Sequence, residues 1–149
     1  MRRLKAGEKS RLLMSLEKNY GLKPGLFKDL TFLINNKNKV FMTNRLLADY
    51  VGYGKFVSIS LPFARMDLAV KPTTIMVQMF GKFATKGFIE VDKKNARRFM
   101  SGEDLEVENE GKGYVIVKYK DECLGVGLLK ENVIKNQVPR AKRLDVDYL

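Results

Sequence analysis

The protein has 149 residues and a net charge of +11, which favours a polyanionic partner over a highly charged protein that has none. It has no histidine and one cysteine, which excludes Ser-His-Asp and Cys-His catalysis, histidine or cysteine metal sites, and an internal disulfide. No apolar run is long enough to span a bilayer, and the basic start resembles an amphipathic helix more than a signal peptide. We therefore expect a cytoplasmic protein with no membrane partner, metal or cofactor.

The first 70 residues predict a small α+β unit. Apolar residues at helical spacing predict a helix that reaches Tyr20 and ends at Gly21. Two apolar runs, 30–34 and 40–43, flank an Asn-rich connection and predict a hairpin. A second helix is expected around 46–50, and residues 57–61 alternate as in a strand.

The chain changes direction at Pro72, after which Thr73 or Thr74 can cap a new helix. This helix carries an apolar stripe, whose members are Met76, Met79, Phe80 and Phe83. The stripe predicts packing between the two halves of the chain, with a binding surface as the alternative.

The second half predicts mostly short strands, at 88–91, 105–107, 114–119, 123–129 and 133–134. One short helix, Lys93–Met100, is expected after an Asp92 N-cap and ends at Ser101-Gly102. Its apolar residues, Ala96, Phe99 and Met100, should face inward, and its basic residues, Lys93, Lys94, Arg97 and Arg98, should face outward. Many short strands with one helix favour a small closed or half-closed barrel.

Gly125 and Gly127 occupy alternate positions of one predicted strand, where glycine weakens pairing. We expect them to permit a barrel corner or a close crossing of another element. The alternative is bare backbone that a ligand can approach.

No route to catalysis is visible in the sequence. It lacks a Gly-rich phosphate loop followed by Lys-Ser/Thr, and Cys123 has no flanking motif of a catalytic thiolate. We therefore predict that the chain is not an enzyme.

Two segments, KPTTIMVQMFGKFATKGFIEVDKKNARRFMSGEDLEV (71–107) and GYVIVKYKDECLGVGLLKENVIKNQVPRAKRL (113–144), resemble a PUA domain. More closely, they resemble the RNA-binding region after the catalytic domain of NOL/NOP/Sun-type RNA cytosine-5 methyltransferases. The whole chain is similar in layout to a small ribosome-biogenesis protein. The resemblance implies a pre-PUA α+β domain, 1–70, and a mixed β pseudo-barrel, the PUA domain, at 71–149.

The resemblance implies that structured RNA lies against the short helix, the following glycine loop and the basic tail. The matching residues are Lys93, Lys94, Arg97, Arg98, Gly102, Arg140, Lys142 and Arg143. Basic side chains on one face supply phosphate contacts, and bare backbone at Gly102 allows close approach. A solvated helix face is the alternative for Lys93 to Arg98.

Two further charged sets qualify this surface. Acidic residues follow Gly102 directly and would repel phosphate, so they mark either the edge of the RNA footprint or a protein-binding edge; they are Glu103, Asp104, Glu106, Glu108 and Glu110. A second candidate RNA surface, or a flexible basic arm, comprises Arg2, Arg3, Lys5, Lys9 and Arg11.

The chain lacks the S-adenosylmethionine-binding loop and Pro-Cys pair of the methyltransferases. We therefore predict a non-catalytic protein that binds ribosomal RNA, with transfer RNA as the alternative, in ribosome biogenesis or RNA modification. Ribosome-assembly proteins or an RNA methyltransferase are the implied protein partners. The competing hypotheses are a separate subunit that targets a methyltransferase to RNA, an RNA-modifying enzyme with an unrecognised site, and a protein–protein adaptor.

Overall fold

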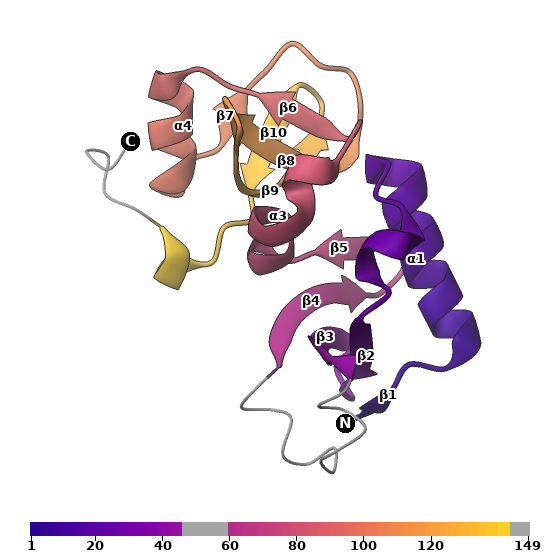
Figure 1. Ribbon diagram of the computed structural model, residues 1–149. Coiled ribbons are helices and arrows are strands. Elements are labelled where there is room, and N and C mark those ends of the chain that lie inside the picture. The colour runs from indigo at the N-terminus through magenta and orange to yellow at the C-terminus, as the bar shows by residue number, and fades with distance from the viewer. Residues whose placement is uncertain (46–59, 144–149) are drawn as a thin grey trace.

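The computed structural model describes residues 1–45 and 60–143, and these fold around two sheets (Figure 1). The first sheet has the order β1-β2-β3-β4-β5, and every neighbouring pair in it is antiparallel. Its strands are β1 (Arg2–Arg3), β2 (Leu30–Ile34), β3 (Lys39–Asn44), β4 (Leu61–Met66) and β5 (Val70–Pro72).

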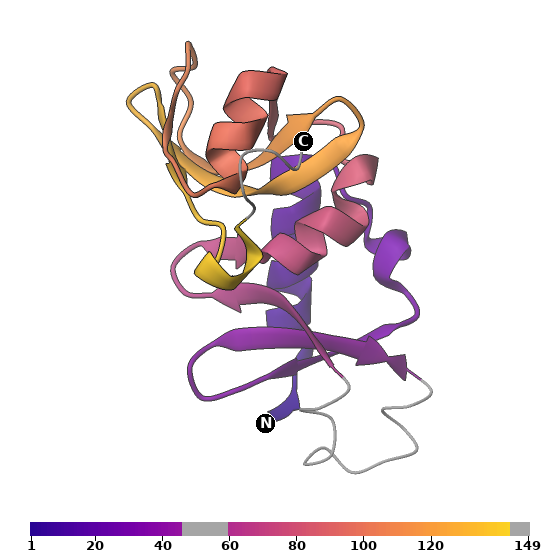
Figure 2. The ribbon, with the colours of Figure 1, turned by 90° about the vertical axis from the view of Figure 1, so that its left-hand side faces the viewer.

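The second sheet has the order β6-β8-β9-β10-β7. Its strands are β6 (Phe88–Glu90), β7 (Leu105–Glu106), β8 (Gly113–Tyr119), β9 (Glu122–Lys130) and β10 (Val133–Asn136). Strand β6 is parallel to β8, whereas the other pairs are antiparallel. This mixed sheet curves into a half-barrel, which confirms the predicted α+β fold with a PUA-type pseudo-barrel (Figure 2).

Helices connect and cover the sheets. They are α1 (Ala6–Tyr20), α3 (Thr74–Phe80) and α4 (Lys93–Met100), with the 3₁₀ turns η1 (Pro24–Phe27), η3 (Gly81–Phe83) and η4 (Arg140–Lys142). Figure 1 shows α1 running along one side of the molecule, past the first sheet and up to the second. Among residues 1–45 and 60–143, no helix is long and apolar enough to cross a membrane.

The first helix and the hairpin form as predicted. Leu12, Leu16 and Tyr20 recur every four residues along α1 and are buried, and Gly21 ends the helix with φ +70°. The Tyr20 hydroxyl donates to the Tyr114 carbonyl at 2.9 Å, so the end of α1 is attached to the second half of the chain. The predicted helix around 46–50 and most of the strand at 57–61 lie outside the described residues.

Helix α3 lies between the sheets. The Thr73 side chain caps it by accepting from the Met76 N–H at 3.2 Å, as predicted. Met76 is buried in a core that also holds Phe63 of the first sheet and Ile116 of the second. Since this core joins both halves, the division into domains 1–70 and 71–149 stays a prediction.

Part of the predicted apolar stripe is wrong. Met76 is fully buried, but Met79 is 44% exposed and Phe83 is 50% exposed. The helix has only seven residues, and the 3₁₀ turn that follows it changes the period. As a result Gly81, rather than Phe83, faces the second sheet, where a Cβ on it would lie 2.7 Å from the Cys123 Sγ.

The strand glycines permit close crossings inside the second half. A Cβ on Gly125 would lie 2.9 Å from a Val138 methyl, and one on Gly127 would collide with a methyl of Ile134. Both glycines are buried. These contacts support the packing explanation over a bare backbone that a ligand approaches.

Candidate nucleic-acid interface

Helix α4 presents a basic face to solvent. The Asp92 carboxylate caps its start by accepting from the Asn95 N–H at 2.8 Å. As predicted, Ala96, Phe99 and Met100 are buried. Their burial fixes the rotation of the helix, so its four basic residues lie outside the core; Lys93 and Lys94 are exposed, and Arg97 and Arg98 are half-buried.

Arg98 is directed by its neighbours at the end of α4. Its guanidinium donates to the Asn95 amide oxygen at 3.2 Å and lies 3.5 Å from the Glu103 carboxylate. The Arg98 carbonyl accepts from the Ser101 hydroxyl at 2.8 Å and from the Glu103 N–H at 3.0 Å. The ion pair is largely exposed, so it orients Arg98 without holding it strongly.

The glycine loop meets the basic tail. Gly102 has φ +103°, a conformation that a side chain disfavours. The Arg143 guanidinium lies directly over Gly102, and its Nε donates to the Val138 carbonyl at 3.3 Å. The tail therefore packs on the loop where Arg143 covers Gly102, and the Arg98 carbonyl at the end of the helix is bonded to the same loop through Ser101 and Glu103.

Asn136, at the end of β10, holds this arrangement together. Its side-chain amide donates to the Phe99 carbonyl at 2.6 Å and the Glu103 carbonyl at 2.9 Å. Its amide oxygen accepts from the Val138 N–H at 2.8 Å. The sequence analysis missed this residue, although an asparagine two residues before an apolar residue at a strand end is typical of such a turn.

The other predicted RNA-binding residues are more scattered. Lys93 and Lys94 lie at the opposite end of α4 from Gly102. Arg140 and Lys142 are exposed on η4, which lies below the C-terminal end of α4 in both views (Figures 1 and 2). The basic face is therefore a strip along α4 that continues towards the tail.

The acidic residues after Gly102 divide into two groups. Glu103 pairs with Arg98, and the Asp104 carboxylate accepts from the Asn136 N–H at 2.8 Å, so both help to build the loop. Glu106 and Glu108 are exposed and line a shallow hollow with Glu131. This acidic hollow lies at β7 and opposes the binding of a polyanion there.

The basic residues at the N-terminus divide: Arg3 and Lys9 line one pocket, whereas Arg2 and Arg11 bond to other parts of the chain. Arg2 donates to both carboxylate oxygens of Glu8, at 2.7 and 3.0 Å. This bond and one from the Lys5 N–H lower the pKa of Glu8 to about 2. Arg11 donates to the carbonyls of Asp67 and Leu68, which precede β5.

No catalytic constellation is present among the described residues. Burial raises the pKa of the Cys123 thiol, although the nearby Lys118 opposes the shift. A thiol with a raised pKa is a weak nucleophile at neutral pH. Within 1–45 and 60–143, no three His, Cys, Asp or Glu residues gather in a group that could hold a metal ion.

Comparison with known proteins agrees with this geometry. Residues 86–144 match the family described as the Methyltransferase RsmF PUA domain. This region of the chain is a PUA domain. It is related to the C-terminal region of Sun-type RNA methyltransferases, as the resemblance implied. The matched region contains α4, the Gly102 loop and the tail as far as Arg143.

Similar curated proteins carry one name, Ribosomal RNA small subunit methyltransferase F. The protein from Aeromonas salmonicida is 30% identical over 139 residues, which cover 92% of this chain and 28% of that protein. The protein from Vibrio vulnificus is 40% identical over 55 residues, which cover 37% of this chain and 12% of the relative. The chain thus spans less than a third of the length of these relatives.

A solved structure shows the same fold. It is a hypothetical protein from the hyperthermophilic archaea Pyrococcus horikoshii OT3, with a TM-score of 0.55 and 12% sequence identity. The match covers 95% of this chain and 87% of that structure, so the likeness includes the first half as well as the PUA domain.

Proposed function

We propose that the chain binds structured RNA, ribosomal RNA in the first place, through the strip formed by α4, the Gly102 loop and the basic tail. The 149 residues bind and perform no chemistry of their own. The observation that carries this proposal is the packing of the Arg143 guanidinium on the Gly102 loop, which follows the basic face of α4. A guanidinium beside a glycine loop can contact a backbone phosphate, and the helix lysines and arginines can contact others.

The biological setting of the proposal is ribosome biogenesis or ribosomal RNA modification. Its support is the name of the relatives, which describes methyltransferases of small-subunit ribosomal RNA. The net charge of +11 supplies the long-range attraction to any polyanion, and the shape of the loop and strip supplies the preference for a folded RNA.

A second candidate is delivery of RNA to a methyltransferase. The relatives favour this role, because the 139 matching residues form only 28% of the A. salmonicida methyltransferase. In that relative, the matching region is therefore part of a longer protein that is named a methyltransferase. In this role the chain binds the same RNA through the same strip, and a methyltransferase is its protein partner. If a methyltransferase copurifies with the chain, the chain delivers RNA to that enzyme. If no methyltransferase copurifies, the chain binds RNA alone.

The test is a comparison of affinities for a ribosomal RNA fragment, a transfer RNA and a DNA duplex across a salt series. The variant Arg98→Glu/Arg143→Glu reverses two charges at the Gly102 end of the strip. The matched control, Lys37→Glu/Lys86→Glu, makes the same change of charge on two exposed residues of remote loops. A preference for one RNA that persists at high salt, and that only the strip variant loses, is the expected result. If wild type and variants bind the two RNAs and the DNA duplex equally, and this binding is lost at high salt, the result would instead favour a protein–protein adaptor.

A further inference from the structure

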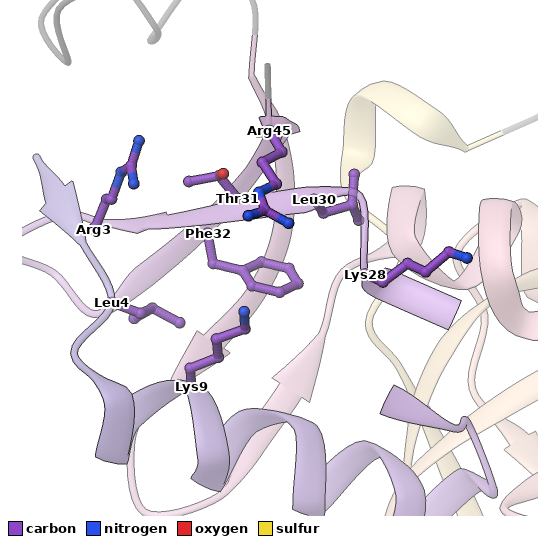
Figure 3. A pocket seen from close by; sticks show the side chains of 8 residues that line it. All are labelled: Arg3, Leu4, Lys9, Lys28, Leu30, Thr31, Phe32 and Arg45. Carbon is purple, nitrogen blue, oxygen red and sulfur yellow. The ribbon is translucent and has the colours of Figure 1, made fainter. Parts of the chain in front are cut away.

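A basic pocket lies against the first sheet, beside β1 and β2. In Figures 1 and 2 these two strands lie at the opposite end of the molecule from α4. Its volume is about 460 Å³, and Figure 3 shows the side chains that line it. They are Arg3, Leu4, Lys9, Lys28, Leu30, Thr31, Phe32 and Arg45. None belongs to the PUA match at 86–144.

Backbone hydrogen bonds hold the walls of this pocket. The Leu4 N–H donates to the Phe32 carbonyl at 3.1 Å, which continues the pairing of β1 with β2. The Arg45 N–H donates to the Asp29 carbonyl at 3.0 Å, which extends the ladder between β2 and β3 by one step. The basic side chains are thus supplied by separate segments whose positions the sheet fixes.

The described residues that line the pocket include four basic side chains and no acidic one. Arg3 comes from β1, Lys9 from α1, and Arg45 follows β3; Lys28 points outward at the rim (Figure 3). The nearby Glu8 is bound by Arg2 and does not line the pocket. In Figure 3 the Lys9 and Arg45 side chains lie on either side of the Phe32 ring, so the lining offers positive charge to an anion from more than one segment.

Among the described lining residues, the apolar wall offers no exposed aromatic ring to a base. Phe32 is only 3% exposed, and Leu4 and Leu30 are half-buried. The polar side chains of the lining are the four basic residues and Thr31. Such groups recognise phosphate oxygens rather than base edges or faces.

We propose that this pocket binds a backbone phosphate of the RNA, as a second contact remote from the PUA strip. The inference rests on the proposed function for the identity of the macromolecule. It accounts for the charge of the first 70 residues, which carry 13 Lys and Arg against 5 Asp and Glu. An RNA held at both places spans the length of the molecule.

The first test uses inorganic phosphate and does not depend on RNA. Phosphate is titrated into the full chain, and amide shifts of Leu4, Thr31 and Arg45 are followed by NMR. Saturable shifts that the variant Lys9→Glu/Arg45→Glu abolishes, and that Lys86→Glu retains, are the expected result. If the shifts are absent, or are equal in the wild type and both variants, the pocket does not bind phosphate and the proposal is wrong.

The second test measures RNA affinity against salt. Each phosphate contact contributes about 0.7–0.9 to the slope of log K against log [salt]. The variant Lys9→Glu/Arg45→Glu should therefore lower the slope by about one or more, with equal loss for different RNA sequences. If this variant binds RNA with the same salt slope as the wild type, the pocket does not contact the RNA, whereas the proposed function is unaffected. Absence of RNA preference in the wild type would defeat the proposed function, and the phosphate titration would then decide the pocket alone.

Discussion

The guanidinium of Arg143 occupies the space that a side chain at Gly102 would need. A Cβ on Gly102 would lie 2.7 Å from the Arg143 Nε and 2.8 Å from its Cδ and Cζ. The backbone conformation is a second reason for glycine at this position, because residues with a side chain disfavour a φ of +103°. The loop after α4 and the basic tail are therefore coupled through this one position.

Gly102→Ala should cost about 1–3 kcal/mol of stability because of its backbone conformation. It should also displace Arg143 and weaken the binding of structured RNA. Urea unfolding measures the first effect, and RNA titration of the folded protein measures the second.

Gly113→Ala is the matched control for this substitution. Gly113 has a similar φ of +108°, but nothing lies within 4 Å of the position of its Cβ. It should lose similar stability and keep its RNA affinity. Equal loss of RNA affinity in both variants would show that the contact between Gly102 and Arg143 has no role in binding.

Asn136→Ala should loosen the loop and the tail together. It removes the bonds to the Phe99 and Glu103 carbonyls and to the Val138 N–H. Each buried group left without a partner costs about 1–3 kcal/mol. The neighbouring exposed Lys135→Ala should leave the unfolding midpoint unchanged. If Asn136→Ala unfolds at the same urea concentration as wild type, Asn136 does not hold the site.

Much of the fold could be predicted because local signals agree with the tertiary packing. The apolar spacing of α1, its Gly21 stop and the Asp92 cap of α4 each act within a few residues. The exposed Phe83 was missed because its orientation depends on how a short helix passes into a 3₁₀ turn. The 3₁₀ turn packs with Gly81 against Cys123, and a side chain at position 81 would collide with the Cys123 Sγ. Cys123 is remote in sequence, so this packing has no local signal.

The candidate site could be predicted only in part. The resemblance placed the helix, the loop and the tail near one another, and the structure adds that Arg143 covers Gly102. The connecting role of Asn136 and the basic pocket with Lys28 and Arg45 were missed. Both depend on pairings between distant strands, and no local pattern in a single sequence specifies those pairings.

Arg2→Ala should return the pKa of Glu8 towards the ordinary carboxyl value of 4.5. Arg2 is the largest cause of the lowered pKa, ahead of the Lys5 N–H. Since the folded-state pKa is lowered, the stabilisation is present above the ordinary value and is lost as the pH falls towards 2. NMR titration of the Glu8 carboxyl carbon measures the shift. An unchanged titration in Arg2→Ala would contradict the pairing.

Gly125→Ala and Gly127→Ala should destabilise the protein without affecting the RNA affinity of the folded fraction. Overpacking of this kind costs about 1–3 kcal/mol, and Gly127 should cost more because its Cβ would collide with Ile134. Gly7→Ala is the control, since a Cβ there meets nothing within 4 Å in α1. It should gain about 0.5–1 kcal/mol. Lost affinity in folded Gly125→Ala would revive the idea that RNA approaches this strand.

Lys93→Glu/Lys94→Glu should weaken RNA binding and stabilise the fold. Both lysines are exposed in the first turn of α4, where a positive charge opposes the helix dipole. Replacement by glutamate should therefore gain about 0.3–1 kcal/mol per position, while it places negative charge on the proposed RNA strip. A higher melting temperature together with a weaker RNA affinity would exclude unfolding as the cause of the lost binding. Unchanged affinity in a stabilised variant would confine the RNA contact to the Gly102 end of the helix.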